Sequence, residues 1–343
     1  STQGYSSAAS DVYKRQSEYG VGARKFIPDL VKYYEISLVD YIPITHKTYK
    51  LSTENGQQYF LKETTDSTLN KYQYLESKGI SNVLYPILNK EKRFITKTNN
   101  LSFYINDYLS NIPVRDDIKA ANLFNELNIL HHQTTIRKNL DPSKARVKFD
   151  ELSSQLDYKF RMLELLVRKV ESKPLDMFSM PILENYHYIL DAKRELIKLQ
   201  KRIISSVKAK ESVEYSFVHN NPSIDHLLNV RGVNYLTSLD HSKIGISSLD
   251  MAKFYVLNEH LDIDYKSLIL NEYYNENQLF YYDYFRYLVL VIYIKRMNVS
   301  TEEYVNANLF VSTANVIQRY FHNFSDYQEE TSKPDQTSYN NQY

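Results

Sequence analysis

The 343-residue sequence contains no cysteine and no tryptophan, and it has only 7 glycines and 9 prolines. Without cysteine the chain cannot form disulfides, use a thiolate nucleophile or hold zinc or an iron–sulfur cluster through sulfur ligands. The scarcity of glycine matters locally, because Gly22 is the only glycine between Val21 and Glu54. The turn expected near residues 44–48 therefore cannot be a glycine-rich phosphate loop, which needs bare backbone close to a nucleotide.

The sequence also lacks an excess of either charge, with 42 Lys and Arg against 41 Asp and Glu and a net charge of +1. This balance does not favour nucleic acid or an anionic membrane surface as a partner. The apolar stretch at residues 280–295 is interrupted by Asp283 and Arg286. Its uncharged part, residues 287–294, is too short to cross a bilayer. We therefore expect no nucleic-acid partner and no membrane partner, and the absence of cysteine favours a cytoplasmic location.

Hydrophobic residues make up 43% of the chain and aromatic residues 14%, which is enough for a substantial core. Two terminal segments fall outside this expectation. Residues 6–16 (SSAASDVYKRQ) resemble the translation of a sequencing adapter, so we expect residues 1–16 to be an artefactual, disordered start. Residues 325–343 are polar and should form a disordered tail.

The N-terminal part has the pattern of a small antiparallel sheet with one helix. A strand leads to residues 47–51, Asn55-Gly56 supplies the residues of a tight hairpin turn, and residues 58–62 return. A helix is predicted over residues 69–78, ending at Gly79. Further predictions are strands at 83–88, 93–97 and 101–107, with a turn at residues 99–100.

The remainder has mostly helical patterns. A helix is predicted over residues 114–132, and two long apolar stripes predict a helical insert at about residues 146–210. After a short strand region, further helices are predicted over four ranges, namely residues 249–261, 265–275, 278–297 and 298–322.

Between these helices lie three linked segments: residues 217–228 (FVHNNPSIDHLL), 234–240 (NYLTSLD) and 247–252 (SSLDMA). Their order is a strand entering a polar loop, a strand ending on Asp240, and a helix containing Asp250. This order resembles the active-site core of the protein-kinase-like phosphotransferases. The resemblance is to the branch that contains aminoglycoside phosphotransferases, choline kinases and the kinase-like bacterial spore-coat proteins.

In that branch the loop is usually H-G-D-x-x-x-x-N, and the resemblance assigns each motif position to a residue here. The motif histidine is His219, and the catalytic aspartate position holds Asn221. The metal-binding asparagine position holds His226, the second metal ligand is Asp240, and Asp250 supports the loop.

At two of these motif positions, the residue in this chain differs chemically from the usual one. Asn221 cannot act as a base, although its amide can orient a hydroxyl. His226 is a poor magnesium ligand, because magnesium prefers hard oxygen ligands. Asp225 would replace it only after a one-residue slip of the loop.

The resemblance implies an α+β, two-lobed protein-kinase-like fold. Its small antiparallel-sheet lobe would span residues 17–109, and its larger helical lobe residues 110–324. It also implies that Lys62 holds nucleotide phosphates and that Asn106, Asp107 and Tyr108 form the nucleotide-binding hinge. The usual helix glutamate is missing, since Glu76 lies too close to the helix end and Asp66 is the nearest substitute.

Two functions remain open. One is a pseudokinase with a binding or scaffolding role, which the spore-coat relatives would allow to be spore-associated. The other is an active phosphotransferase that moves the ATP γ-phosphate to a hydroxyl of a small substrate. In either case ATP and Mg²⁺ are expected to bind weakly if they bind, and the remaining ligand class is a nucleotide or small hydroxylated molecule.

Overall fold

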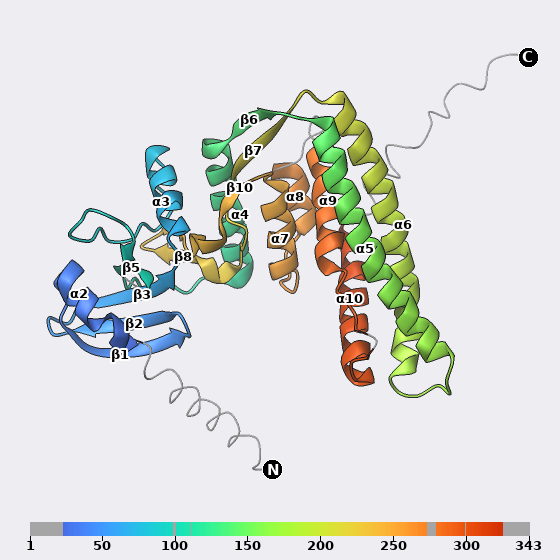
Figure 1. The fold of residues 1–343 in the computed structure, drawn as a ribbon, viewed down its shortest axis with the longest axis horizontal. Coiled ribbons are helices and arrows are strands. Elements are labelled where there is room, and N and C mark those ends of the chain that lie inside the picture. Colours follow the sequence, from blue (N-terminus) through green and yellow to red (C-terminus); the bar gives the residue numbers. More distant parts are fainter. Residues whose placement is uncertain (1–22, 99–100, 111, 273–278, 299, 325–343) are drawn as a thin grey trace, which may run out of the picture. The chain divides into compact units, whose positions relative to one another are not determined.

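The computed structural model describes residues 23–98, 101–110, 112–272, 279–298 and 300–324. These residues form two compact units. The first unit contains the described residues up to Thr134 together with Ile224–Lys243, and the second contains Thr135–Ser223 and the described residues from Ile244 onward (Figure 1).

The first unit is built on a five-stranded antiparallel sheet. Its strand order is β1-β2-β3-β5-β4, in which β5 pairs with both β3 and β4. The strands are β1 Leu38–Thr45, β2 Thr48–Thr53, β3 Gln58–Thr64, β4 Thr96–Lys97 and β5 Ser102–Asp107. The predicted turn at Asn55-Gly56 joins β2 to β3, with Gly56 at a φ of 79° that suits glycine.

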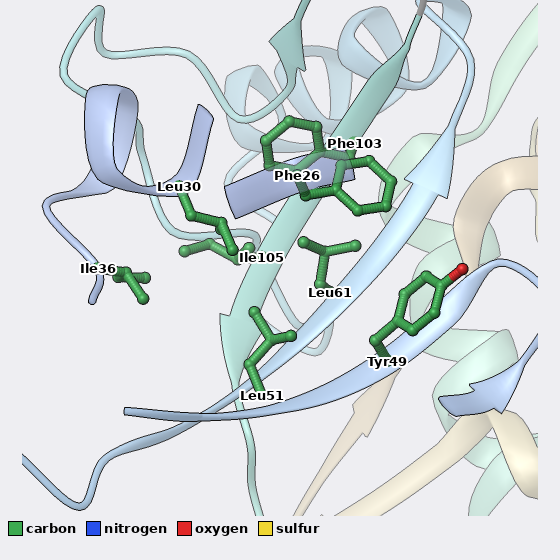
Figure 2. Close-up of a cluster of buried hydrophobic side chains, with 8 residues drawn as sticks. All are labelled: Phe26, Leu30, Ile36, Tyr49, Leu51, Leu61, Phe103 and Ile105. Atoms are coloured by element: carbon green, nitrogen blue, oxygen red, sulfur yellow. The ribbon is translucent and has the colours of Figure 1, made fainter. Parts of the chain in front are cut away.

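One face of this sheet carries the core of the unit (Figure 2). The 3-10 helix η1 (Ala23–Phe26) and helix α2 (Ile27–Tyr34) cover that face. The buried side chains of the cluster are Phe26, Leu30, Ile36, Tyr49, Leu51, Leu61, Phe103 and Ile105. The rings of Phe26 and Phe103 meet edge to face, with their centroids 5.0 Å apart. Burial of each large apolar side chain contributes about 1.5–3 kcal/mol, so this face fixes which residues point the other way.

Helix α3 (Ser67–Ser77) confirms the predicted helix, and Gly79 follows it at a φ of 67°. Of the two strands predicted after it, the one at residues 83–88 was wrong and the one at residues 93–97 was too long. Residues 83–88 form no strand; Val83 makes a single parallel bridge to Leu236. Pro86 lacks an amide hydrogen and so cannot donate within a ladder.

The predicted strand at residues 93–97 is only β4, because its start belongs to a turn. The side chain of Asn89 accepts hydrogen bonds from the backbone amides of Glu91 and Arg93, each at 3.0 Å. Lys92 lies between them at a φ of 59°. The predicted turn at residues 99–100 lies outside the described residues.

Five more elements complete the first unit and lead to Asp240. Helix α4 (Asp116–Thr134) confirms the helix predicted over residues 114–132. The others are η2 (Ile224–His226), the hairpin of β8 (Leu227–Val230) and β9 (Val233–Leu236), and η3 (Leu239–His241).

The second unit is mostly helical. The predicted insert is a hairpin of two long helices, α5 (Pro142–Glu171) and α6 (Ser179–Ala209), which lie side by side (Figure 1). A small sheet of order β10-β7-β6 joins β6 (Ile136–Asn139), β7 (Ser212–Val218) and β10 (Lys243–Gly245). The remaining helices are α7 (Ser248–Asn258), α8 (Tyr265–Glu272), α9 (Leu279–Tyr293) and α10 (Glu303–Phe324).

The fold agrees with the predicted α+β class, an antiparallel sheet followed by a mostly helical region. The predicted lobe boundary at residues 109 and 110 remains a prediction; the compact units group α4 and residues 224–243 with the sheet. The predicted disordered segments at residues 1–16 and 325–343 lie outside the described residues. No helix among the described residues is long and apolar enough to span a membrane.

Candidate functional site

Lys62 and Asp240 form an ion pair in the first unit. Lys62 lies near the end of β3, and Asp240 lies in η3. The Lys62 Nζ is 2.5 Å from Oδ2 of Asp240, and the two side chains are 17% and 19% exposed. Lys62 also donates to the hydroxyl of Ser238 at 3.3 Å. The backbone of Ser238, at a φ of 61°, is left-handed just before η3. The two residues that the resemblance pairs with nucleotide phosphates and metal therefore lie together.

Thr64 holds the other oxygen of the same carboxylate. Its hydroxyl donates to Oδ1 of Asp240 at 2.5 Å and bonds to the hydroxyl of Thr68 in α3 at 2.8 Å. Burial alone raises the pKa of Asp240, but the charge of Lys62 and the hydrogen bonds from Lys62 and Thr64 outweigh it and lower that pKa. Asp240 is therefore held as a carboxylate with both oxygens engaged.

A second lysine approaches Asp240 from α3. The Lys71 Nζ donates to the backbone carbonyl of Asp240 and lies 3.5 Å from the carbonyl oxygen of Leu239. Burial lowers the pKa of the Lys71 ammonium, and the nearby Asp240 charge opposes that shift only in part. Sequence reasoning missed this residue because it looked for a carboxylate on the helix.

The spacing of α3 contained the signal for Lys71. Thr68, Tyr72 and Leu75 are all buried, and residues three and four apart share one helix face. Lys71 lies on that face. Asp66, the predicted substitute for the missing glutamate, is instead engaged with Lys97 and accepts a hydrogen bond from Ser102 at 2.5 Å.

The three predicted hinge residues follow at the end of β5. Asn106 is buried, and its side-chain amide donates to the carbonyl of Tyr85 at 2.9 Å. Asp107 is exposed at the end of the strand. The Tyr108 amide donates to the carbonyl of Gln58 at 3.0 Å, and its ring lies under the Lys50 ammonium at 4.2 Å. The side chain of Asn106 thus supports the adjoining loop, and the hinge role of the three residues remains a prediction.

The two other predicted metal positions lie in η2. Asp225 is exposed and His226 is partly buried. The carbonyl of His226 accepts hydrogen bonds from the backbone and the hydroxyl of Thr237, at 2.9 and 3.1 Å. Within the described ranges, no three His, Asp or Glu side chains lie close enough together to hold a metal ion. Asp225 therefore joins no such cluster.

In the second unit, Asp250 organises the loop after β7. Its side chain is fully buried, and its two oxygens accept from the backbone amides of His219 and Asn220, both at 2.6 Å. Asn220 has a φ of 65°, and its side chain accepts from Lys253 at 2.7 Å. The backbone N–H of Asn221 donates to Nδ1 of the buried His219 at 3.3 Å. One carboxylate thus fixes the backbone on which Asn221 stands.

The structure therefore brings the predicted residues together in two groups. Lys62 and Asp240 meet in the first unit, where Thr64 and Lys71 join them. His219, Asn221 and Asp250 meet in the second. Their catalytic and binding roles remain predictions.

No protein-family model and no curated protein matches the sequence. Solved structures do match it. An aminoglycoside phosphotransferase from Alicyclobacillus acidocaldarius aligns with a TM-score of 0.62 and 11% identity, over 85% of this chain and 93% of that one. Spectinomycin phosphotransferase APH(9)-Ia gives 0.52 and 15% identity over 87% and 97% of the two chains. Aminoglycoside phosphotransferase APH(4)-Ia gives 0.50 and 12% over 88% and 99%. This chain therefore has the kinase-like fold of the aminoglycoside phosphotransferases.

Proposed function

We propose that this protein is a nucleotide-binding pseudokinase, a kinase-like fold that retains a ligand site and has lost phosphoryl transfer. The observation that carries the proposal is the Lys62–Asp240 ion pair, kept in a chain whose catalytic-base position holds Asn221. The pair supports binding of phosphates. The amide at position 221 argues against transfer.

A nucleotide is the ligand that this pair suits best. In kinases a lysine on the third strand contacts the phosphates, and catalysis depends on positioning and on charge stabilisation. One structural relative, APH(9)-Ia, was solved with ADP and spectinomycin. By analogy, Lys62 would contact the phosphates here, and the backbone of residues 106–108 would contact the base.

Loss of transfer follows from two substitutions. Asn221 has no proton affinity near neutral pH, and a missing general base costs a factor of roughly 10²–10⁴. The turn between β1 and β2 is made of His46 and Lys47 and contains no glycine, so side chains take the place of a close backbone cradle for the γ-phosphate.

The magnesium that such folds use does not fit the residues present. Lys62 and Thr64 engage both carboxylate oxygens of Asp240, and the next metal position holds the imidazole of His226. Magnesium prefers several hard oxygen ligands in octahedral geometry.

An active small-molecule phosphotransferase is the second candidate. The Lys62–Asp240 pair also favours it, because an active site would need the same two groups. The role on a spore coat that the resemblance allows stays a prediction, since no described residue bears on location.

Two measurements on the purified full chain test the proposal. ATP should raise the melting temperature in proportion to saturation, since a ligand of the folded state stabilises it by mass action. Lys62→Ala should abolish the shift, while Asn221→Ala should leave it nearly unchanged.

Transfer of phosphate from ATP to aminoglycosides, choline-like alcohols or sugars should stay at background. Turnover that disappears with Asp240→Ala would establish the active enzyme instead. No shift at millimolar nucleotide, with or without magnesium, would remove the nucleotide from the proposal.

A further inference from the structure

We infer that Lys62 and Lys71 together form a polyphosphate-binding site that works without magnesium, with Lys71 supplying the positive charge that a metal ion supplies in an ordinary kinase. The inference deepens the proposed function, on which it rests for the nucleotide as ligand. It concerns residues of the first unit alone, and Lys71 is a residue to which the resemblance assigns no role.

The charges at this site favour an anion over a cation. Two ammonium groups, Lys62 and Lys71, stand beside one carboxylate, Asp240. Both oxygens of that carboxylate are engaged, Oδ2 with Lys62 at 2.5 Å and Oδ1 with Thr64 at 2.5 Å. A divalent cation would have to displace Lys62 and then stay next to two lysines. A phosphate group meets an excess of one positive charge.

Among the described residues, no carboxylate forms a direct ion pair with the Lys71 ammonium, and the nearest one, Asp240, is already paired with Lys62. Its hydrogen bonds go to the backbone carbonyl oxygens of Asp240 and Leu239. Carbonyl dipoles solvate an ammonium only in part, and a partly buried charge gains from an opposite charge that replaces lost water. The pKa of Lys71 is lowered first by burial, because burial removes water from the ammonium.

The position of Lys71 is fixed before any ligand binds. Thr68, Tyr72 and Leu75 on the same face of α3 are buried, and Thr68 is bonded to Thr64 at 2.8 Å. Thr64 is two residues from Lys62 on β3, so the two lysines are tied together through one threonine pair. A site whose groups are held in place loses less entropy on binding.

The test is calorimetric titration of the full chain with ADP, and separately with inorganic tripolyphosphate, in EDTA and in excess magnesium. Both ligands should bind in EDTA. Magnesium should not strengthen binding, because it competes with the two lysines for the phosphates. A charge-assisted hydrogen bond contributes about 1.5–3 kcal/mol, so Lys71→Met should weaken binding about 10- to 100-fold. Lys71→Arg, which keeps the charge, should retain most of the affinity.

Lys78→Met is the matched control, because Lys78 is the exposed C-cap residue of the same helix, at the end away from Thr68. It should bind like the unaltered protein. Lys71→Glu restores a helix carboxylate and should abolish binding in EDTA. The Lys71→Arg variant and the EDTA comparison keep the test decisive if Lys71→Met does not fold.

The outcomes separate this inference from the proposed function. Nucleotide binding that requires magnesium, or that survives Lys71→Met unchanged, overturns the inference and leaves the nucleotide site standing. Tripolyphosphate that binds through Lys71 while ADP does not bind supports the anion site and removes the nucleotide. Failure of both ligands under both conditions overturns both.

Discussion

The ammonium of Lys62 lies 2.5 Å from the carboxylate of Asp240 and both side chains are mostly buried, although the two residues come from sequence segments far apart. An ion pair on a protein surface contributes about 0–1 kcal/mol, and breaking a fully buried pair costs about 3–5 kcal/mol. This pair is intermediate in exposure. Its contribution to stability and to ligand binding can therefore be measured separately.

A double-mutant cycle on this pair should show strong coupling. We expect Lys62→Met and Asp240→Asn each to lower the free energy of unfolding by about 1–3 kcal/mol. The double variant should lose clearly less than the sum, because each single change leaves the other charge without its partner. Urea unfolding of the four proteins provides the measurement. Strictly additive losses would mean that the pair contributes nothing as a pair.

Asp240 should also contribute to the acid sensitivity of the protein. Its folded-state pKa is lowered, below an unfolded-state value of about 3.9. Its stabilising contribution is then complete above the unfolded-state pKa and is lost as the pH falls through the folded-state pKa. Asp240→Asn should therefore flatten the dependence of unfolding free energy on pH below about pH 4. Parallel curves for the two proteins in that range would contradict the prediction.

Substitution of Asp250 should lower the free energy of unfolding more than most substitutions in the second unit. Asp250→Ala removes the acceptor of two backbone amides, and each buried unsatisfied donor costs about 1–3 kcal/mol. Asp250→Asn keeps one oxygen and should cost about half as much. Thermal melts of both variants give the comparison. Asp262→Ala changes an exposed aspartate of the same unit and should be nearly neutral.

A buried ion pair in the helical unit gives a prediction independent of the candidate site. Arg286 is 2% exposed, and its guanidinium bonds to Glu195 at 2.6 Å and to the hydroxyl of Tyr320 at 3.0 Å. Glu195→Ala leaves the arginine charge buried and should cost about 3–5 kcal/mol. Arg194→Ala, which breaks an exposed pair with Asp191, should cost under about 1 kcal/mol. Chemical denaturation gives the free energy of unfolding of each variant. Equal losses for the two variants would contradict the prediction that the buried pair contributes more to stability than the exposed pair.

The features that could be predicted from the sequence are those decided locally. The turn at Asn55-Gly56 and the helix end at Gly79 depend on backbone conformations that few residue types adopt. The residue type therefore predicts them. The spacing of apolar residues predicted α5 and α6, because the buried stripe of each helix runs through many turns. The order of three motifs predicted the fold class.

What could not be predicted depends on contacts between distant segments. The apolar residues 83–88 look like a strand, but Pro86 and the single bridge at Val83 show that a ladder needs a donor at each step. Lys71 was missed because its place in the candidate site depends on its contact with Asp240, which is far away in the sequence. Thr64 escaped notice for the same reason, since only its partner distinguishes it from an ordinary strand threonine.

The first unit is discontinuous in sequence, and this has a consequence for how the protein folds during synthesis. Its sheet and α3 leave the ribosome early, but η3 and Asp240 follow only after the whole segment Thr135–Ser223. Until then the ammonium groups of Lys62 and Lys71 stay without the carboxylate and carbonyl oxygens that they contact in the finished unit. Pairing across so long a loop is slow, so completion of this unit should be a late event, and a nascent chain stopped before residue 224 should remain open to proteases.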